Sequence, residues 1–167
     1  MGQSALIREV LGIPEEKAGP VPEINFELEK KIAKLINELN LKNNIVGGHD
    51  ISDGGLILAT AEICILNNIG IKIDSNDISW LFGEDQGLYL LVCQEKNKSN
   101  IEQKAKQLRI PLQKLGIFQG NIFEVSNDQI PLNKLSMLYK KGLDQFFWSF
   151  DQLFSDFADI INFKKKF

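Results

Sequence analysis

The sequence predicts an α+β fold in which helices pack on a mixed sheet. Apolar residues at helical spacing alternate along the chain with short segments of strand type. Polar turns of hairpin length join several of these segments, which favours a sheet that is not purely parallel. The expected order is helix, strand, helix, strand, strand, helix, strand, strand, helix. A chain of 167 residues with 44% hydrophobic content can bury a sizeable core.

The N-terminal part is predicted to be a lead-in followed by a capped helix. Residues 1–22 contain a short helix-like piece and then a linker rich in Pro and Gly, which we expect to make few internal contacts and to wrap over a surface. Asn25 is expected to cap a helix over residues 26–40. Apolar residues follow helical spacing there: Leu28, Ile32, Leu35, Ile36 and Leu39.

The central part is organised around residues 47–56, which hold four glycines, two aspartates, a serine and the only histidine of the chain. Ile45 and Val46 open a strand before this stretch, and a Gly-rich turn and a helix start follow it. The next expected elements are a helix over 54–67, an alternating strand over 71–73, a helical turn over 79–82 and a central strand over 88–93.

The last third is predicted to hold one helix, a hairpin and a final helix. Ser99 and Glu102 have the spacing of a capping box and are expected to open a helix that Pro111 stops. The expected elements after it are strands over 112–118 and 122–125, a return strand at Ile130 and a helix from Leu132.

An aromatic stripe at helical spacing ends the sequence: Leu143, Phe146, Phe147, Phe150, Leu153, Phe154 and Phe157. We expect a terminal helix that docks these side chains on the core. The alternative interpretation is a helix that binds a partner.

Composition narrows the class of protein. The net charge of −3 gives no support to nucleic-acid binding. Cys64 and Cys93 lie in apolar surroundings without metal-like spacing, so we expect reduced thiols and a cytoplasmic protein. No apolar run has the length of a signal peptide or a membrane span, so we expect no membrane association.

Residues 52–55 are the best candidates for contact with a phosphate group. The first N–H groups of a helix are unpaired and carry partial positive charge, and glycine lets a ligand approach the backbone closely. Ser52, Gly54 and Gly55 would then face the anion. The alternative is that Ser52 or Asp53 caps the helix with its own oxygen.

Two other residue types in this stretch carry chemistry. Asp50 and Asp53 would either serve Mg²⁺ together with phosphate oxygens or cap backbone N–H groups. His49 has no base partner and no neighbour at metal-ligand spacing, so we interpret it as structural.

Two motifs in this order resemble the last domain of the synthetase subunit of phosphoribosylformylglycinamidine synthase. They are His-Asp-Ile-Ser-Asp-Gly-Gly-Leu at residues 49–56 and Leu-Phe-Gly-Glu-Asp-Gln-Gly at residues 81–87. Gly-Pro-Val-Pro at 19–22 and Ile-Pro-Leu-Gln-Lys-Leu-Gly at 110–116 are similar to further parts of that domain, and the resemblance covers about residues 2–147. The superfamily includes aminoimidazole ribonucleotide synthetase, selenophosphate synthetase and thiamine-monophosphate kinase.

The resemblance implies a fold and an activity. The fold would be a three-layer α/β/α domain with a mixed sheet, partly ferredoxin-like, over residues 23–147, after a lead-in over 1–22 and before a helical extension over 148–167. The intact enzyme would convert formylglycinamide ribonucleotide, ATP and glutamine-derived ammonia to formylglycinamidine ribonucleotide, ADP and phosphate, with Mg²⁺. The family chain is several times longer, and its catalytic histidines and most of its ATP and Mg²⁺ ligands lie outside the part found here.

The isolated chain is therefore expected to be inactive and to bind neither ATP nor Mg²⁺ tightly. Its expected partners are the N-terminal portion of the synthetase and the glutaminase and small accessory subunits. Alternative interpretations are a non-catalytic assembly or regulatory module of that enzyme and a relative of thiamine-monophosphate kinase.

The resemblance also implies site residues. Asp50, Ser52, Gly54 and Gly55 would form the phosphate- or nucleotide-binding turn, and Glu84, Asp85 and Gln86 a turn on the substrate side, with a solvated turn as the alternative for the latter. Leu88 stands where the family usually has Arg, whose guanidinium clamps anions in bidentate fashion.

Overall fold

The structure is a computed structural model that describes residues 2–144. The predicted aromatic helix from residue 145 onward and the extension over 148–167 lie outside the described residues. Contacts divide the described chain into two compact units. Unit 1 consists of residues 2–21, 52–84 and 115–144, and unit 2 consists of residues 22–51 and 85–114. Each unit therefore combines segments that are distant in the sequence.

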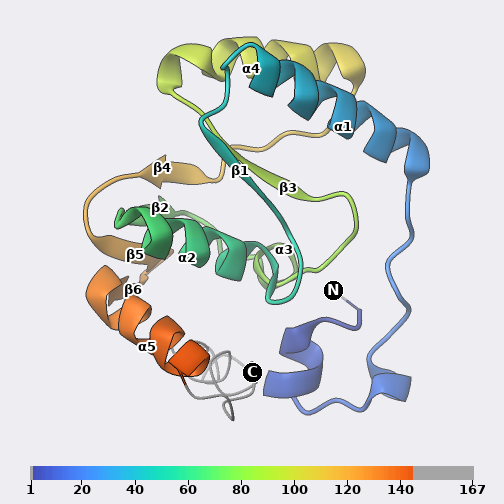
Figure 1. Ribbon diagram of the computed structural model, residues 1–167. Coiled ribbons are helices and arrows are strands. Elements are labelled where there is room, and N and C mark those ends of the chain that lie inside the picture. The colour runs from blue at the N-terminus through green and yellow to red at the C-terminus, as the bar shows by residue number, and fades with distance from the viewer. Residues whose placement is uncertain (1, 145–167) are drawn as a thin grey trace. The chain divides into compact units, whose positions relative to one another are not determined.

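Unit 1 contains a four-stranded mixed sheet (Figure 1). Its strands, in spatial order, are β4 (Gly116–Phe118), β2 (Ile71–Ile73), β5 (Ile122–Val125) and β6 (Asp128–Pro131). The β2 and β5 strands are parallel, and the two outer pairs are antiparallel. The predicted alternation in β2 is confirmed, because Ile71 and Ile73 are buried and Lys72 is exposed. The predicted return of the chain at Ile130 is also confirmed, since it pairs with Phe123.

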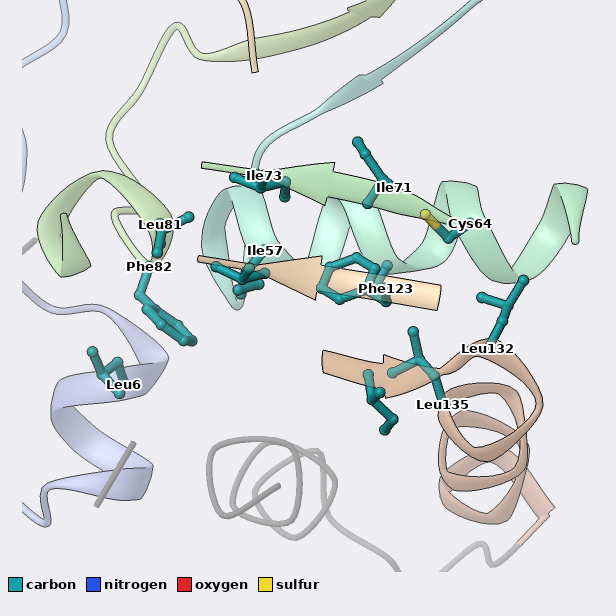
Figure 2. Packing of buried hydrophobic residues seen from close by; sticks show 13 residues of the cluster. Leu6, Ile57, Cys64, Ile71, Ile73, Leu81, Phe82, Phe123, Leu132 and Leu135 are labelled. Atoms are coloured by element: carbon teal, nitrogen blue, oxygen red, sulfur yellow. The ribbon is translucent and has the colours of Figure 1, made fainter. Parts of the chain in front are cut away.

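Helices α2 (Gly55–Asn67) and α5 (Leu132–Asp144) pack with each other, and α5 also packs against strands β5 and β6. The short helix α3 (Ile78–Leu81) lies beside α2. Figure 2 shows how Ile57 and Cys64 of α2, Ile71 and Ile73 of β2, Phe123 of β5 and Leu132 and Leu135 of α5 form one core. The predicted starts of α2 and α5 are correct to within one residue. The α2 residues buried in this core are Ile57, Ala61 and Cys64, whereas Leu66 is 78% exposed.

The N-terminal segment belongs to the same core. It forms a short π-helical piece, η1 (Leu6–Val10), and a 3₁₀ turn, η2 (Glu15–Lys17), and Leu6 is fully buried. The Gln3 side-chain amide donates hydrogen bonds to the carbonyl oxygens of Glu15 at 3.1 Å and Gly19 at 2.8 Å. The expectation of few internal contacts is therefore wrong, because one polar side chain ties both ends of the Pro- and Gly-rich segment together.

Unit 2 consists of a two-stranded antiparallel sheet and two helices. Strand β1 (Gly47–Asp50) pairs with β3 (Tyr89–Val92), and helix α1 (Phe26–Leu41) packs on α4 (Glu95–Leu108). The core between the helices consists of Ile32, Leu35, Leu39, Ile101, Ala105 and Ile110. The predicted cap of α1 is confirmed, since the Asn25 side-chain oxygen accepts a hydrogen bond from the Leu28 N–H at 3.0 Å.

Three predictions for unit 2 are corrected. The capping box at Ser99 and Glu102 is wrong, because α4 begins at Glu95 and both residues lie inside it, with Glu102 one turn after Lys98. Strand β1 begins at Gly47, after the Ile45–Val46 pair that was expected to open it. Strand β3 was expected to be central, but within the described residues it pairs only with β1.

The strand expected over 112–118 is shorter than predicted and is limited to β4. The described chain thus combines helices with two small sheets, one mixed and one antiparallel, where the sequence predicted a single mixed sheet. None of the helices within residues 2–144 is both long and apolar enough to cross a membrane.

Candidate functional site

A backbone hydrogen bond closes the turn before α2. Gly54 is the N-cap residue in the left-handed region at φ 81°, and Gly55 follows at φ 68°. The Gly55 N–H donates to the Ser52 carbonyl oxygen at 2.9 Å. The alternative in which Ser52 or Asp53 caps α2 is therefore wrong, since the cap position belongs to a residue without a side chain.

Both glycines are buried, and protein atoms fill the space beside them. A Cβ atom on Gly55 would lie 2.7 Å from the carbonyl carbon of Phe82, and one on Gly54 would lie 2.8 Å from the Leu58 Cβ. Real Cβ atoms essentially never approach other atoms this closely. Atoms of the chain itself, and not of a ligand, therefore fill the space that the two glycines leave open. At Gly55 these atoms belong to Phe82, the residue after α3.

The carboxylate of Glu84 binds the backbone N–H of Gly54, which was predicted from the sequence to contact a phosphate group. Its Oε1 atom accepts hydrogen bonds from the Gly54 N–H at 2.8 Å and from the Ala5 N–H at 2.9 Å. An anion at the start of a helix is favourable because the first N–H groups lack intrahelical partners. In this structure the chain supplies that anion from thirty positions away.

Burial dominates the electrostatics of Glu84. Loss of hydration raises the pKa of this half-buried carboxyl above its usual value, and the negative charge of Asp53 adds to the rise. The hydrogen bonds from Ala5 and Gly54 and the positive charge of Arg8 act in the opposite direction and are weaker. The carboxylate is therefore ionised at a cost that its two backbone donors only partly offset.

The predicted site residues of unit 2 lie in strand β1 and in the turn before β3. Asp50 is exposed and lies opposite Tyr89 in the sheet. The His49 ring nitrogen Nδ1 donates to the Asp50 carbonyl oxygen at 2.5 Å, which agrees with a structural histidine. Asp85 and Gln86 are both exposed.

Two residues of unit 2 that sequence reasoning missed stand beside this turn. The Tyr89 hydroxyl donates to the Glu29 carboxylate at 3.1 Å, and this hydrogen bond is the main cause of the raised pKa of Tyr89. A Cβ atom on Gly87, at φ 77°, would lie 2.8 Å from Glu29 Oε1. The turn thus reaches the first turn of α1, a long-range contact without a local sequence signal.

The predicted site residues therefore fall into two groups. Unit 1 holds Ser52, Gly54, Gly55 and Glu84, and a hydrogen bond joins the first motif to the second within it. Unit 2 holds Asp50, Asp85 and Gln86. The ligand assigned to these seven residues stays a prediction. Within residues 2–144, no group of three or more His, Cys, Asp or Glu side chains is placed to hold a metal ion.

Residues 2–123 match the protein family described as AIR synthase related protein, C-terminal domain. Among curated proteins, the chain is 34% identical over 140 residues to phosphoribosylformylglycinamidine synthase subunit PurL of Ruegeria sp. (strain TM1040), which covers 84% of this chain and 19% of the relative. It is 34% identical over 151 residues to the PurL subunit of Bartonella quintana (strain Toulouse), which covers 87% of this chain and 20% of the relative. The chain thus spans about a fifth of the length of the curated relatives it matches.

Solved structures with a similar fold are those of PurL from Thermotoga maritima. A crystal structure of that protein covers 74% of this chain and 23% of its own length, with a TM-score of 0.63 and 19% identity. A structure of the same protein complexed with FGAR has a TM-score of 0.58 and 19% identity over 65% of this chain and 21% of its own. Further T. maritima structures are a complex with ATP, with a TM-score of 0.57, and the PurLQS structure, with a TM-score of 0.55.

Proposed function

Because the chain belongs to the AIR synthase related protein, C-terminal domain family, we propose that it is the C-terminal domain, or a separate fragment, of a phosphoribosylformylglycinamidine synthase. That purine-biosynthesis ligase joins formylglycinamide ribonucleotide to glutamine-derived ammonia at the expense of ATP. Similarity to PurL subunits over more than four-fifths of this chain supports the proposal. The observation that carries it is the pair of motifs at residues 49–56 and 81–87, in which Glu84 of the second motif binds the Gly54 N–H of the first.

The proposed role is that of a domain without turnover of its own. The chain spans about a fifth of the PurL relatives. We assign ATP and Mg²⁺ to the intact enzyme rather than to this chain, since T. maritima PurL has been solved with ATP. The proposed domain is residues 23–147 with a lead-in over 1–22 and an extension over 148–167, and we propose that it has the three-layer α/β/α fold with a mixed sheet, partly ferredoxin-like, and lies in the cytoplasm.

The proposed site comprises two turns. Asp50, Ser52, Gly54 and Gly55 form the proposed phosphate- or nucleotide-side turn. Glu84, Asp85 and Gln86 form the proposed substrate-side turn, which lines the site without taking part in the chemistry. The exposed carboxylate of Asp85 and the exposed amide of Gln86 are suited to cations and to hydrogen-bonding groups, respectively.

The test is reconstitution. ATP- and ammonia-dependent formation of formylglycinamidine ribonucleotide is measured for the chain alone, for the N-terminal portion of the synthetase alone and for the mixture. We expect turnover only in the mixture. Turnover by the chain alone would contradict the fragment role, and a mixture no more active than the N-terminal portion would contradict a contribution of this chain to turnover. Inspection of the flanking DNA for an open reading frame that encodes the remaining portion is an independent check.

A second candidate is a non-catalytic assembly module of the same enzyme. Leu88 stands where the family usually has an Arg that binds anions, and the Glu84 carboxylate already accepts a hydrogen bond from the Gly54 N–H. T. maritima PurL is also known in a PurLQS structure. Size-exclusion chromatography of the chain with the N-terminal portion and the glutaminase distinguishes the two roles. A module forms the complex and leaves the rate of ligation unchanged, whereas a catalytic domain forms the complex and raises it.

A further inference from the structure

We propose that Glu84 is a latch that holds the N-terminal segment closed against the first turn of α2. We call residues 2–21 the strap. The latch consists of one carboxylate oxygen, Glu84 Oε1, that accepts hydrogen bonds from the Ala5 N–H of the strap and from the Gly54 N–H at the start of α2. This inference concerns the chain's own conformation and does not depend on the proposed ligase.

The strap is tied to itself and therefore moves as one piece. The Gln3 side chain binds the carbonyl oxygens of Glu15 and Gly19, and the Gln3 N–H donates to the Ala18 carbonyl oxygen at 3.1 Å. A Cβ atom on Gly2 would lie 2.3 Å from the Pro20 carbonyl oxygen, so the two ends of the strap touch. A force or a ligand that releases one part of such a loop releases the rest with it.

The strap is attached to the remainder of unit 1 by an apolar anchor and a polar one. Leu6 is fully buried in the unit 1 core, which also contains Leu81 and Phe82 (Figure 2). The residue before it, Ala5, donates to Glu84. The polar anchor also involves α2, because the same oxygen binds Gly54. Opening of the strap and exposure of the Gly54 amide are therefore coupled, and by thermodynamic reciprocity each favours the other.

The buried hydroxyl of Ser4 opposes closure of the strap. Ser4 is fully buried, and its hydroxyl has no hydrogen-bond partner among residues 2–144. A buried hydroxyl that lacks a partner loses the hydrogen bonds that water would give it, so Ser4 favours the open strap. Glu84 and Ser4 thus act in opposite directions on adjacent residues of the same segment. Opening of the strap withdraws Leu6 from the unit 1 core, so it is a local unfolding event.

The experiment measures strap opening directly in the full chain. Hydrogen exchange at the Ala5 and Gly54 amides is followed by NMR, and tryptic cleavage after Arg8 is followed by mass spectrometry. E84A removes the acceptor. We expect exchange at both amides and cleavage after Arg8 to accelerate about thirtyfold, the factor that loss of two hydrogen bonds of ordinary net strength gives. E84Q retains the Oε1 acceptor and is expected to stay close to the wild type.

S4A tests the opposite direction. It removes the unpartnered hydroxyl, so we expect slower exchange at Ala5 and slower cleavage after Arg8. E95A is the matched control, because Glu95 is an exposed glutamate of α4. Exchange at Ala61 and Cys64 of α2, which lie in the unit 1 core, reports on unfolding of unit 1 and is expected to be the same in all variants.

If E84A fails to fold, E84D replaces it, since that carboxylate is one methylene shorter and no longer reaches both donors. Wild-type exchange at Ala5 in every Glu84 variant that folds would overturn the latch. Acceleration at Ala5 without acceleration at Gly54 would overturn the coupling between the strap and α2.

Discussion

Gly55 and Phe82 are in backbone contact, so that a Cβ atom on Gly55 would lie 2.7 Å from the Phe82 carbonyl carbon and 2.8 Å from its Cα. Phe82 is fully buried in the core of unit 1. The second glycine of the Gly54–Gly55 pair is thus required by packing, because no flexible side chain stands at the contact that could move aside. This requirement holds whether or not the turn binds a ligand.

G55A is expected to destabilise the chain by about 2–4 kcal/mol, because a left-handed residue gains a side chain and that side chain overlaps backbone. G12A is the matched control, since Gly12 has a similar φ of 62° and no atom of the described residues lies within 4 Å of an added Cβ. It is expected to cost about 1 kcal/mol. Urea denaturation measures both, and equal losses would show that the Phe82 contact is unimportant.

The stability contributed by Glu84 is expected to fall as pH rises. The folded-state pKa lies above the ordinary value of 4.5, so the folded chain binds this proton more tightly than the unfolded chain. The contribution is complete below pH 4.5 and is lost as pH rises through the raised pKa. The measurement is the free energy of unfolding of the wild type minus that of E84Q across this interval. A difference that grows with pH would mean that the two backbone donors outweigh burial.

The pKa of the Glu38 carboxyl is expected to be about 2 in the wild type and to be higher in K104M. Its carboxylate binds the Lys104 and Lys42 ammonium groups, and the hydrogen bond from Lys104 is the largest cause of the lowered pKa. The contribution of Glu38 to stability is present above its ordinary pKa of 4.5 and disappears as pH falls towards 2. NMR titration of the Glu38 carboxyl carbon should show a rise in K104M and none in K96M, which alters an exposed lysine of the same helix.

Cys93 is expected to react with thiol reagents in the folded protein, and Cys64 only after unfolding. Burial raises the pKa of the fully buried Cys64 thiol to about 12. Cys93 is half-buried, and burial raises its pKa above the ordinary value as well. Labelling with an aromatic disulfide at neutral pH should show one slow phase that C93S abolishes. A residual phase in C93S at low denaturant would indicate local opening around Cys64.

Helices with local signals were predictable from the sequence. Helix α1 starts where Asn25 caps it, because the cap and the apolar stripe lie within one segment. The helix start predicted from the Ser99 capping box was wrong, because residues 95–98 are also helical and extend α4 by one turn at its start. Strand β1 was misplaced because Gly47 and Gly48 have no side chains and hence no periodicity, so its position is fixed by pairing with Leu91 and Val92.

The candidate site was predictable as two turns but not as contacts. The sequence placed Gly54 at the start of a helix and Glu84 in an acidic turn. No local sequence pattern indicates that the Glu84 carboxylate binds the Gly54 N–H, because the two residues are thirty positions apart. The second donor, the Ala5 N–H, is a backbone group and therefore gives no signal in the residue type. The Tyr89–Glu29 hydrogen bond escaped prediction for the same reason.

Leu6 and Leu135 lie in one core although they stand near opposite ends of the described chain (Figure 2). During synthesis on a ribosome, the part of this core that lies in α5 emerges long after Leu6. The core cannot be completed before α5 has emerged, and nascent chains that stall before β5 will expose apolar surface to chaperones. Folding that depends on such distant pairings is slow compared with that of a helical bundle of equal size.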